Sequence, residues 1–174
     1  TSIGRNPFKG CDKLTSIIVS VDHPTLATID GVLFEKSTKT LICYPCASKA
    51  KRYAIPQGIK IIGASAFYDC DSLTSIALPD SVTSIGDRAF MSCVNLENTV
   101  VSDQLTTLGA MAFAFCNKLT QGYYPAMLNT LGGNPYAGLD KAKIVLSEQN
   151  MNFVCETDEN GVLYVYDFEK TTIY

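Results

Sequence analysis

The fold is decided by residues 59–79, which read IKIIGASAFYDCDSLTSIALP. A near copy follows at residues 82–96, which read VTSIGDRAFMSCVNL. An aromatic residue marks the period, because Phe67, Phe90, Phe113 and Tyr136 follow one another at intervals of 23 residues. Apolar residues keep fixed offsets from each aromatic, so this stretch is one unit of a repeat.

A period of roughly 20–29 residues with fixed apolar positions is typical of a leucine-rich repeat solenoid. Four residues before each aromatic, including Phe8 of the first unit, stands a glycine: Gly4, Gly63, Gly86, Gly109 and Gly132. This glycine column indicates either a backbone turn with positive φ or coils that lie too close together for a Cβ atom. A strand is expected later in each unit, with inward positions at Ile17 and Val19, Ile76 and Leu78, and Thr99 and Val101.

The units divide the chain into a first repeat at residues 1–20, an inserted segment at 21–57, repeats two to five at 58–147, and a second, truncated hairpin segment at 148–174. The insert is expected to form a hairpin, because two β-rich runs at 27–34 and 40–45 flank a polar turn. A similar pattern returns at residues 159–174. We therefore expect all 174 residues to form one solenoid segment of a longer repeat protein. The fourth and fifth units depart from the pattern, with Gly122, Tyr124 and Ala142 in place of aliphatic residues.

These residues resemble the BspA-like leucine-rich repeat family. Its unit, Ile-Gly-x-x-Ala-Phe-x-x-Cys-x-x-Leu-x-x-Ile-x-Leu-Pro, is matched by residues 62–79, and its Asp-Gly-Val-Leu hairpin by residues 30–33. The resemblance implies a right-handed β/α-type superhelix with a parallel β-sheet on one face and inserted β-hairpins. It also implies a bacterial protein that is secreted or displayed at the cell surface, where it acts as an adhesin or host-interaction module. The family motif contains no catalytic residues.

Composition narrows the classes of partner. Apolar residues make up 47% of the chain and charged residues 18%, which favours a continuous core over disorder. The net charge of −3 gives no basic patch for nucleic acid. No apolar run approaches the ~18 residues that a membrane helix needs, so no direct membrane insertion is expected.

The cysteines have two possible interpretations, as apolar packing groups or as reactive sites. Four of the seven lie three residues after an aromatic: Cys11, Cys70, Cys93 and Cys116. Stacked side chains point the same way, so we expect these sulfurs to pack side by side as free thiols, although neighbouring Cα atoms come close enough for a disulfide. Cys43 and Cys46 have the C-x-x-C spacing of redox pairs and of half a zinc site, but no second pair completes such a site. We expect most cysteines to be free and no metal or cofactor to be bound.

His23 is the single histidine, so a Cys-His or Ser-His-Asp site would have to include it. Its place just before the hairpin predicts a solvated loop residue instead. The aromatic residues of the two hairpins are predicted to cover the solenoid edge: Phe34, Tyr44, Tyr164 and Tyr166. The sequence therefore predicts that the chain is not an enzyme.

The outward face of the expected sheet is the remaining candidate site. Outward positions alternate with inward ones and form columns across neighbouring strands. One column is polar, with Ser16 at its start, and the next is largely apolar. Exposed apolar columns can mark contact sites, although single exposed apolar residues are normal. The candidate partner-binding residues are Ile18, Ser75, Ala77, Asn98, Val100, Gln121 and Tyr123.

We therefore expect a non-catalytic protein-interaction module of a cell-surface or secreted adhesin-like protein, which binds an extracellular protein or glycan on its sheet face. The alternative is a structural spacer that presents another domain and has no ligand of its own. Anchor motifs and a separate domain in a longer sequence would favour the spacer.

Overall fold

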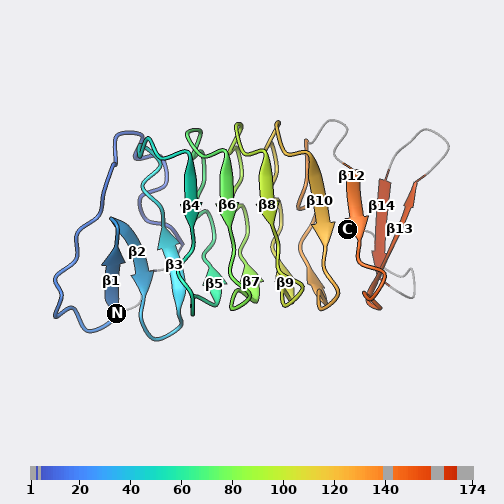
Figure 1. The fold of residues 1–174 in the computed structure, drawn as a ribbon, viewed down its shortest axis with the longest axis horizontal. Helices are drawn as coiled ribbons and strands as arrows, with labels where there is room; N and C mark the ends of the chain where they lie inside the picture. The colour runs from blue at the N-terminus through green and yellow to red at the C-terminus, as the bar shows by residue number, and fades with distance from the viewer. Residues whose placement is uncertain (1–2, 4, 139–142, 158–162, 168–174) are drawn as a thin grey trace.

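The structure, a computed structural model, describes residues 3, 5–138, 143–157 and 163–167. Successive turns of the chain, here called coils, stack side by side along one axis (Figure 1). Each regular coil contributes one short strand to each of two rows, which run along different sides of the stack (Figure 1).

The larger row is a seven-stranded sheet in the order β1-β2-β3-β5-β7-β9-β11. Its strands pair in parallel from β3 onward, and the ladder joins Ile62 to Ile85 and Ile85 to Leu108. Because paired residues are 23 positions apart, each coil takes one repeat. The strands are β1 (Leu26–Ile29), β2 (Val32–Glu35), β3 (Thr40–Cys43), β5 (Ile61–Ile62), β7 (Ser84–Ile85), β9 (Thr107–Leu108) and β11 (Thr130–Leu131).

The second row is divided into separate pieces. A three-stranded parallel sheet has the order β4-β6-β8, and β10 pairs in parallel with β12. At the far end of the stack, β13 and β14 form an antiparallel pair. The strands are β4 (Arg52–Ala54), β6 (Ser75–Ala77), β8 (Asn98–Val100), β10 (Gln121–Tyr124), β12 (Lys143–Leu146), β13 (Phe153–Thr157) and β14 (Leu163–Asp167).

The expected β/α superhelix is not confirmed, because the described residues contain no α-helix. The prediction had a sheet on one face, whereas the structure has strands on two. Left-handed backbone at Ser65 (φ 58°) and Asp69 (φ 63°) prevents a helix in the segment that carries the aromatic. The N–H of Ser65 donates instead to the Asp87 carbonyl at 2.9 Å, and that of Phe67 to the Ala89 carbonyl at 2.7 Å. Hydrogen bonds to the next coil thus replace those of a helix.

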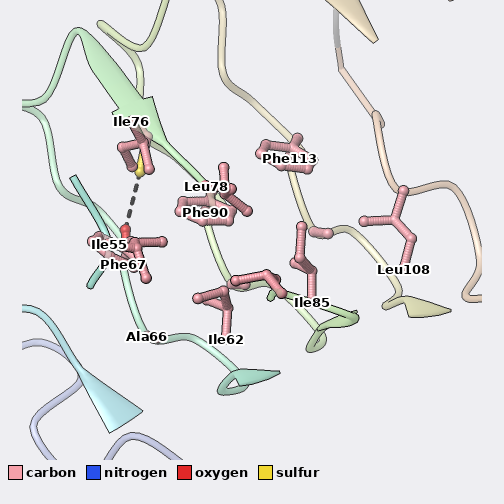
Figure 2. Close-up of a cluster of buried hydrophobic side chains, with 14 of the residues drawn as sticks. Ile55, Ile62, Ala66, Phe67, Ile76, Leu78, Ile85, Phe90, Leu108 and Phe113 are labelled. Atoms are coloured by element: carbon pink, nitrogen blue, oxygen red, sulfur yellow. Dashed lines mark hydrogen bonds between the residues drawn. The ribbon is translucent and has the colours of Figure 1, made fainter. Parts of the chain in front are cut away.

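The core is organised by a single file of aromatic rings, which confirms the repeat register of the sequence (Figure 2). Ring centroids lie 4.9 Å apart between Phe67 and Phe90, 4.9 Å between Phe90 and Phe113, and 5.5 Å between Phe113 and Tyr136. Each stacked pair contributes about 0.5–1.5 kcal/mol beyond the burial of its area. The aliphatic residues five positions before the aromatics form a second buried file: Ile62, Ile85 and Leu108 (Figure 2).

The insert forms a three-stranded antiparallel arrangement, β1-β2-β3, and not a single hairpin. Asp30 (φ 51°) and Gly31 (φ 77°) divide the first β-rich run, and positive φ at two successive residues is the type I′ hairpin turn. The expected hairpin is the one between β2 and β3. The second expected hairpin, at 159–174, lies partly outside the described residues, and its strand β14 pairs with the unexpected β13.

Tyr44, which follows β3, stands at the head of the ring file, ahead of Phe67. The Tyr44 ring stacks on Phe67 with centroids 5.0 Å apart. Phe8 packs against a smaller, separate cluster that contains Leu33 and Cys43. The expected strand of the first repeat is wrong, because residues 13–20 form no strand. The insert is therefore the direct neighbour of the second repeat.

The prediction that hairpin aromatics cover the edge of the solenoid is confirmed for the first hairpin. Phe34 and Tyr44 are both buried in the main core. The side chains of Tyr164 and Tyr166 lie outside the described part of the chain.

Close approach between coils, and not positive φ, explains the glycine column. A Cβ atom on Gly86 would lie 2.7 Å from the Ala64 nitrogen, and one on Gly63 would lie 2.9 Å from the Leu41 oxygen. Gly4 lies outside the described residues. Positive φ occurs two residues after each described glycine of the column: at Ser65, Arg88, Met111 and Asn134.

Replacing a ring in the file should destabilise the whole stack. We expect Phe90→Ala to lower the free energy of unfolding by about 3–5 kcal/mol, because it leaves a cavity and removes two ring contacts. Phe115→Ala is the matched control, since its ring is 43% exposed and lies outside the file. Chemical denaturation would measure both variants, and equal losses would contradict the role of the file.

Substitutions at Gly86 and at Arg88 should change the free energy of unfolding in opposite directions. Gly86→Ala should destabilise by about 1–3 kcal/mol, because the new Cβ meets the preceding coil. Arg88→Gly should stabilise by up to about 1 kcal/mol, because glycine adopts φ near 55° without strain. Arg88→Ala removes the same side chain and keeps the strain, so it serves as control. Thermal and chemical unfolding would test the signs, and a loss of stability in Arg88→Gly would contradict this explanation.

Candidate functional site

The outward face of β4, β6 and β8 brings together four of the predicted binding residues. Ser75 lies beside Asn98 in the ladder, and Ala77 lies beside Val100. In β6, the side chain of Ile76, between Ser75 and Ala77, is buried. Ala77 is exposed, and Val100 is 72% exposed. These four residues therefore form two adjacent rows on one face.

Ile18 does not join these rows. Its side chain is 91% exposed, but the neighbours of Ser75 and Ala77 on that side are Arg52 and Ala54 of β4. The preceding N–H, that of Ile17, donates to the Gly31 carbonyl at 2.9 Å. The first repeat is thus separated from the candidate face by the insert.

Arg52 and Ala54 are members of the face that sequence reasoning missed, because the insert was expected to extend to residue 57. A signal for them is present in the sequence. One period of 23 residues before β6 lies the run Tyr53-Ala54-Ile55-Pro56, which matches Ile76-Ala77-Leu78-Pro79.

A groove opens where β8 meets β10. β8 is an edge of its sheet, since β10 pairs with β12 and not with β8. One backbone hydrogen bond joins the coils just before these strands, from the Thr120 N–H to the Glu97 carbonyl at 3.4 Å. The resulting cavity has a volume of about 300 Å³. It is lined by residues of both strands, among them Asn98, Val100, Gln121 and Tyr123.

Tyr136, and not β8, is the hydrogen-bond partner of the Tyr123 backbone in β10. Its buried hydroxyl donates to the Tyr123 carbonyl at 3.0 Å and accepts from the Tyr123 N–H at 3.0 Å. Burial raises the pKa of Tyr136, so the hydroxyl keeps the proton that it donates. Gly122 makes this possible, because a Cβ there would lie 3.0 Å from the Tyr136 ring. Gly122, which departs from the repeat pattern, therefore leaves space for the ring of Tyr136, the last ring of the file.

Tyr123 is also fixed at its outer end. Its hydroxyl donates to Oδ1 of Asp103 at 2.8 Å. Partial burial, with a smaller contribution from Asp103, raises the pKa of Tyr123. The ring is half-buried beside the groove. Its backbone and its hydroxyl are thus both held in place.

Comparison with known proteins identifies the repeat. The BspA-type leucine-rich repeat region matches residues 1–47 and 40–156 in six copies. The chain belongs to the BspA-type leucine-rich repeat family. No curated protein matches the sequence.

Solved structures of bacterial leucine-rich repeat proteins are similar to this fold. A leucine-rich cell surface protein from Faecalibacterium prausnitzii is 33% identical with a TM-score of 0.77, over 86% of this chain and 40% of that one. The pneumococcal vaccine antigen PcpA is 26% identical with a TM-score of 0.74, over 78% of this chain and 34% of that one. A leucine-rich repeat protein from Bacteroides capillosus is 26% identical with a TM-score of 0.61, over 70% of this chain and 99% of that one. The BspA-type chain thus spans less than half of the first two proteins.

One cysteine of the repeat column forms a disulfide, which corrects the prediction of free column thiols. Cys70 is bonded to Cys46, with Cα atoms 4.5 Å apart. Tyr44 packs directly against Phe67 of the second repeat, so Cys46 faces Cys70 across the coil boundary. The C-x-x-C motif is therefore not a redox pair, because Cys43 remains a buried free thiol.

The other buried column thiols are free, as predicted. The thiol of Cys93 donates to the Phe67 carbonyl at 3.0 Å, and that of Cys116 to the Phe90 carbonyl at 3.1 Å. A hydrogen bond to the Cys116 thiol, together with burial, raises the pKa of Cys93. Burial raises the pKa of Cys43 to about 11. Thiols in this state are poor nucleophiles at neutral pH.

His23 holds a turn and is half-buried, where a solvated residue was expected. Its Nδ1 accepts hydrogen bonds from the N–H groups of Thr25 at 3.3 Å and Leu26 at 3.0 Å. The ring therefore orders the start of β1.

Two further findings apply to the described ranges of the chain. They contain no cluster of three or more His, Cys, Asp or Glu side chains that could hold a metal ion. Within them, no helix has the length and apolar character needed to cross a bilayer.

Alkylation should distinguish the exposed thiol, the buried thiols and the disulfide-bonded cysteines. Native protein treated with iodoacetamide should be modified at the exposed Cys11 and protected at Cys43, Cys93 and Cys116. Unfolding without a reductant should expose those three and leave Cys46 and Cys70 unmodified. Peptide-resolved mass spectrometry would measure each site. Alkylation of Cys70 in unfolded, unreduced protein would contradict the disulfide.

Proposed function

We propose that this BspA-type chain is a non-catalytic interaction module of a cell-surface or secreted, adhesin-like protein, and that it binds a macromolecule on the outward face of β4, β6, β8 and β10. One observation carries the proposal. The row formed by Ala54, Ala77 and Val100 is exposed and apolar, and it ends at the β8–β10 groove. An exposed apolar row on a flat solenoid sheet is typical of contact sites.

The distribution of the reactive groups supports a role in binding. His23 is engaged in a turn, and the buried thiols are hydrogen bonded or held protonated. The repeat motif specifies inward-facing packing groups. Its outward positions are not needed for packing and are available for contact with a partner. A binding role is therefore compatible with every residue of the repeat unit.

Support for a surface location comes from the relatives. The similar protein from Faecalibacterium prausnitzii is described as a cell surface protein. We extend that location to this chain as part of the proposal.

The second candidate is a spacer that presents another domain and has no ligand. The continuous ladder from β3 to β11 favours it, because such a stack resists bending between coils. A spacer would tolerate charge on the outward face without loss of function, and a binding module would not.

A charged residue on the apolar row should reduce binding and leave the fold intact. We expect Val100→Asp to weaken binding to an extracellular partner by at least about tenfold, since a carboxylate at the centre of an apolar contact must be desolvated. The measurement is a sensor assay against immobilised extracellular-matrix proteins and glycans, with circular dichroism to check folding. Thr107→Asp is the control, because it places the same charge in β9, on the other row of strands. Equal binding by both variants would contradict the site, and no binding to any probe would favour the spacer.

A further inference from the structure

The β8–β10 groove differs from the rest of the outward face in its chemistry. The exposed side chains that line it include the carboxylate of Glu97 and the amides of Asn98 and Gln121. No lysine, arginine or histidine is among the residues that line it. An anionic ligand, such as a sulfated glycan or a phosphate group, would find no counter-charge there.

Backbone groups add to this polar lining. β8 is a sheet edge on the side of β10, and an edge strand leaves N–H and C=O groups without ladder partners. Thr99, at the centre of β8, lines the groove. The Tyr123 N–H donates to the Tyr136 hydroxyl and not to β8. Apart from the Glu97 carboxylate, the groove therefore offers a mixture of neutral donors and acceptors.

The Tyr123 ring provides an apolar surface at fixed orientation. The N–H and the carbonyl of Tyr123 both form hydrogen bonds with the Tyr136 hydroxyl, and the Tyr123 hydroxyl donates to Asp103. A ring that is already ordered loses little conformational entropy when a ligand packs on it. The electron-rich face of an aromatic ring attracts the slightly positive edges of apolar C–H groups.

We propose that this groove binds a short segment of neutral carbohydrate, which packs its C–H face on Tyr123 and places its hydroxyl groups against Asn98, Gln121 and the edge of β8. A hydroxyl is both donor and acceptor, so a polyol satisfies a mixed set of donors and acceptors that an anion cannot. The cavity of about 300 Å³ suits a small part of a longer chain. This inference depends on the proposed function in one respect: both place the ligand on the same outward face.

A protein segment fits the groove less well. A peptide anchor needs a deep apolar pocket at the centre of a large contact. Here apolar side chains such as Val100 share the lining with exposed amides and a carboxylate. Peptide binding is therefore an outcome that would overturn the inference.

The test uses the full chain and a panel of immobilised oligosaccharides: neutral glucose-, galactose- and mannose-containing chains, and sulfated counterparts of the same chains. We expect binding to neutral members that does not weaken at high salt, because no ion pair contributes. Tyr123→Ala should reduce the affinity about tenfold or more, and Gln121→Ala by a smaller factor. Tyr123→Phe keeps the ring and should retain most of the affinity. Thr107→Ala, on the other sheet, is the control and should bind as the parent chain does.

The same sensor would carry immobilised extracellular-matrix proteins, so that the two proposals can fail separately. Binding to a protein that Val100→Asp abolishes, without binding to any neutral sugar, would overturn the carbohydrate site and leave the proposed function standing. Binding only to sulfated chains would also overturn it. If Tyr123→Ala does not fold by circular dichroism, Gln121→Ala decides, and unchanged sugar affinity in that folded variant contradicts the site.

Discussion

The structure depends on equal spacing between stacked aromatic rings and paired strands. Ring centroids in the file lie 4.9 Å apart at Phe67–Phe90 and Phe90–Phe113, and neighbouring strands in a sheet lie about 4.8 Å apart. A coil therefore cannot shift without losing ring contacts and hydrogen bonds together. The glycine column and the thiol–carbonyl bonds fit this spacing, because both occupy places where one coil touches the next.

The sequence predicted the parts of the fold that repeat. The interval between aromatics gave the register that joins Ile62 to Ile85, because one period maps each coil onto the next. The sequence did not predict the absence of helix. Ser65 and Asp69 have left-handed backbone, but serine and aspartate also occur in helices, so their identity does not indicate this conformation. The Cys46–Cys70 bond was missed because it depends on Tyr44 stacking on Phe67, which is a consequence of how the insert packs.

The candidate face was predictable where the repeats are regular and not at its two ends. Ser75, Ala77, Asn98 and Val100 occupy the expected rows because alternation along a strand fixes which side chains point outward. Ile18 does not lie in these rows, because residues of the insert, Arg52 and Ala54, take the neighbouring positions. The groove arises from a hydroxyl of one buried tyrosine and the glycine that admits it, and neither the period nor the alternation contains that information.

The hydrogen bonds between coils have a mechanical consequence, because they lie parallel to the axis of stacking (Figure 1). Tension applied between the two ends loads the coil boundaries in series, so the boundaries open one after another and the chain lengthens in steps. The bond between Cys46 and Cys70 crosses one of these boundaries covalently. A stretched stack would therefore open at its other coil boundaries while the insert and the second repeat stay joined.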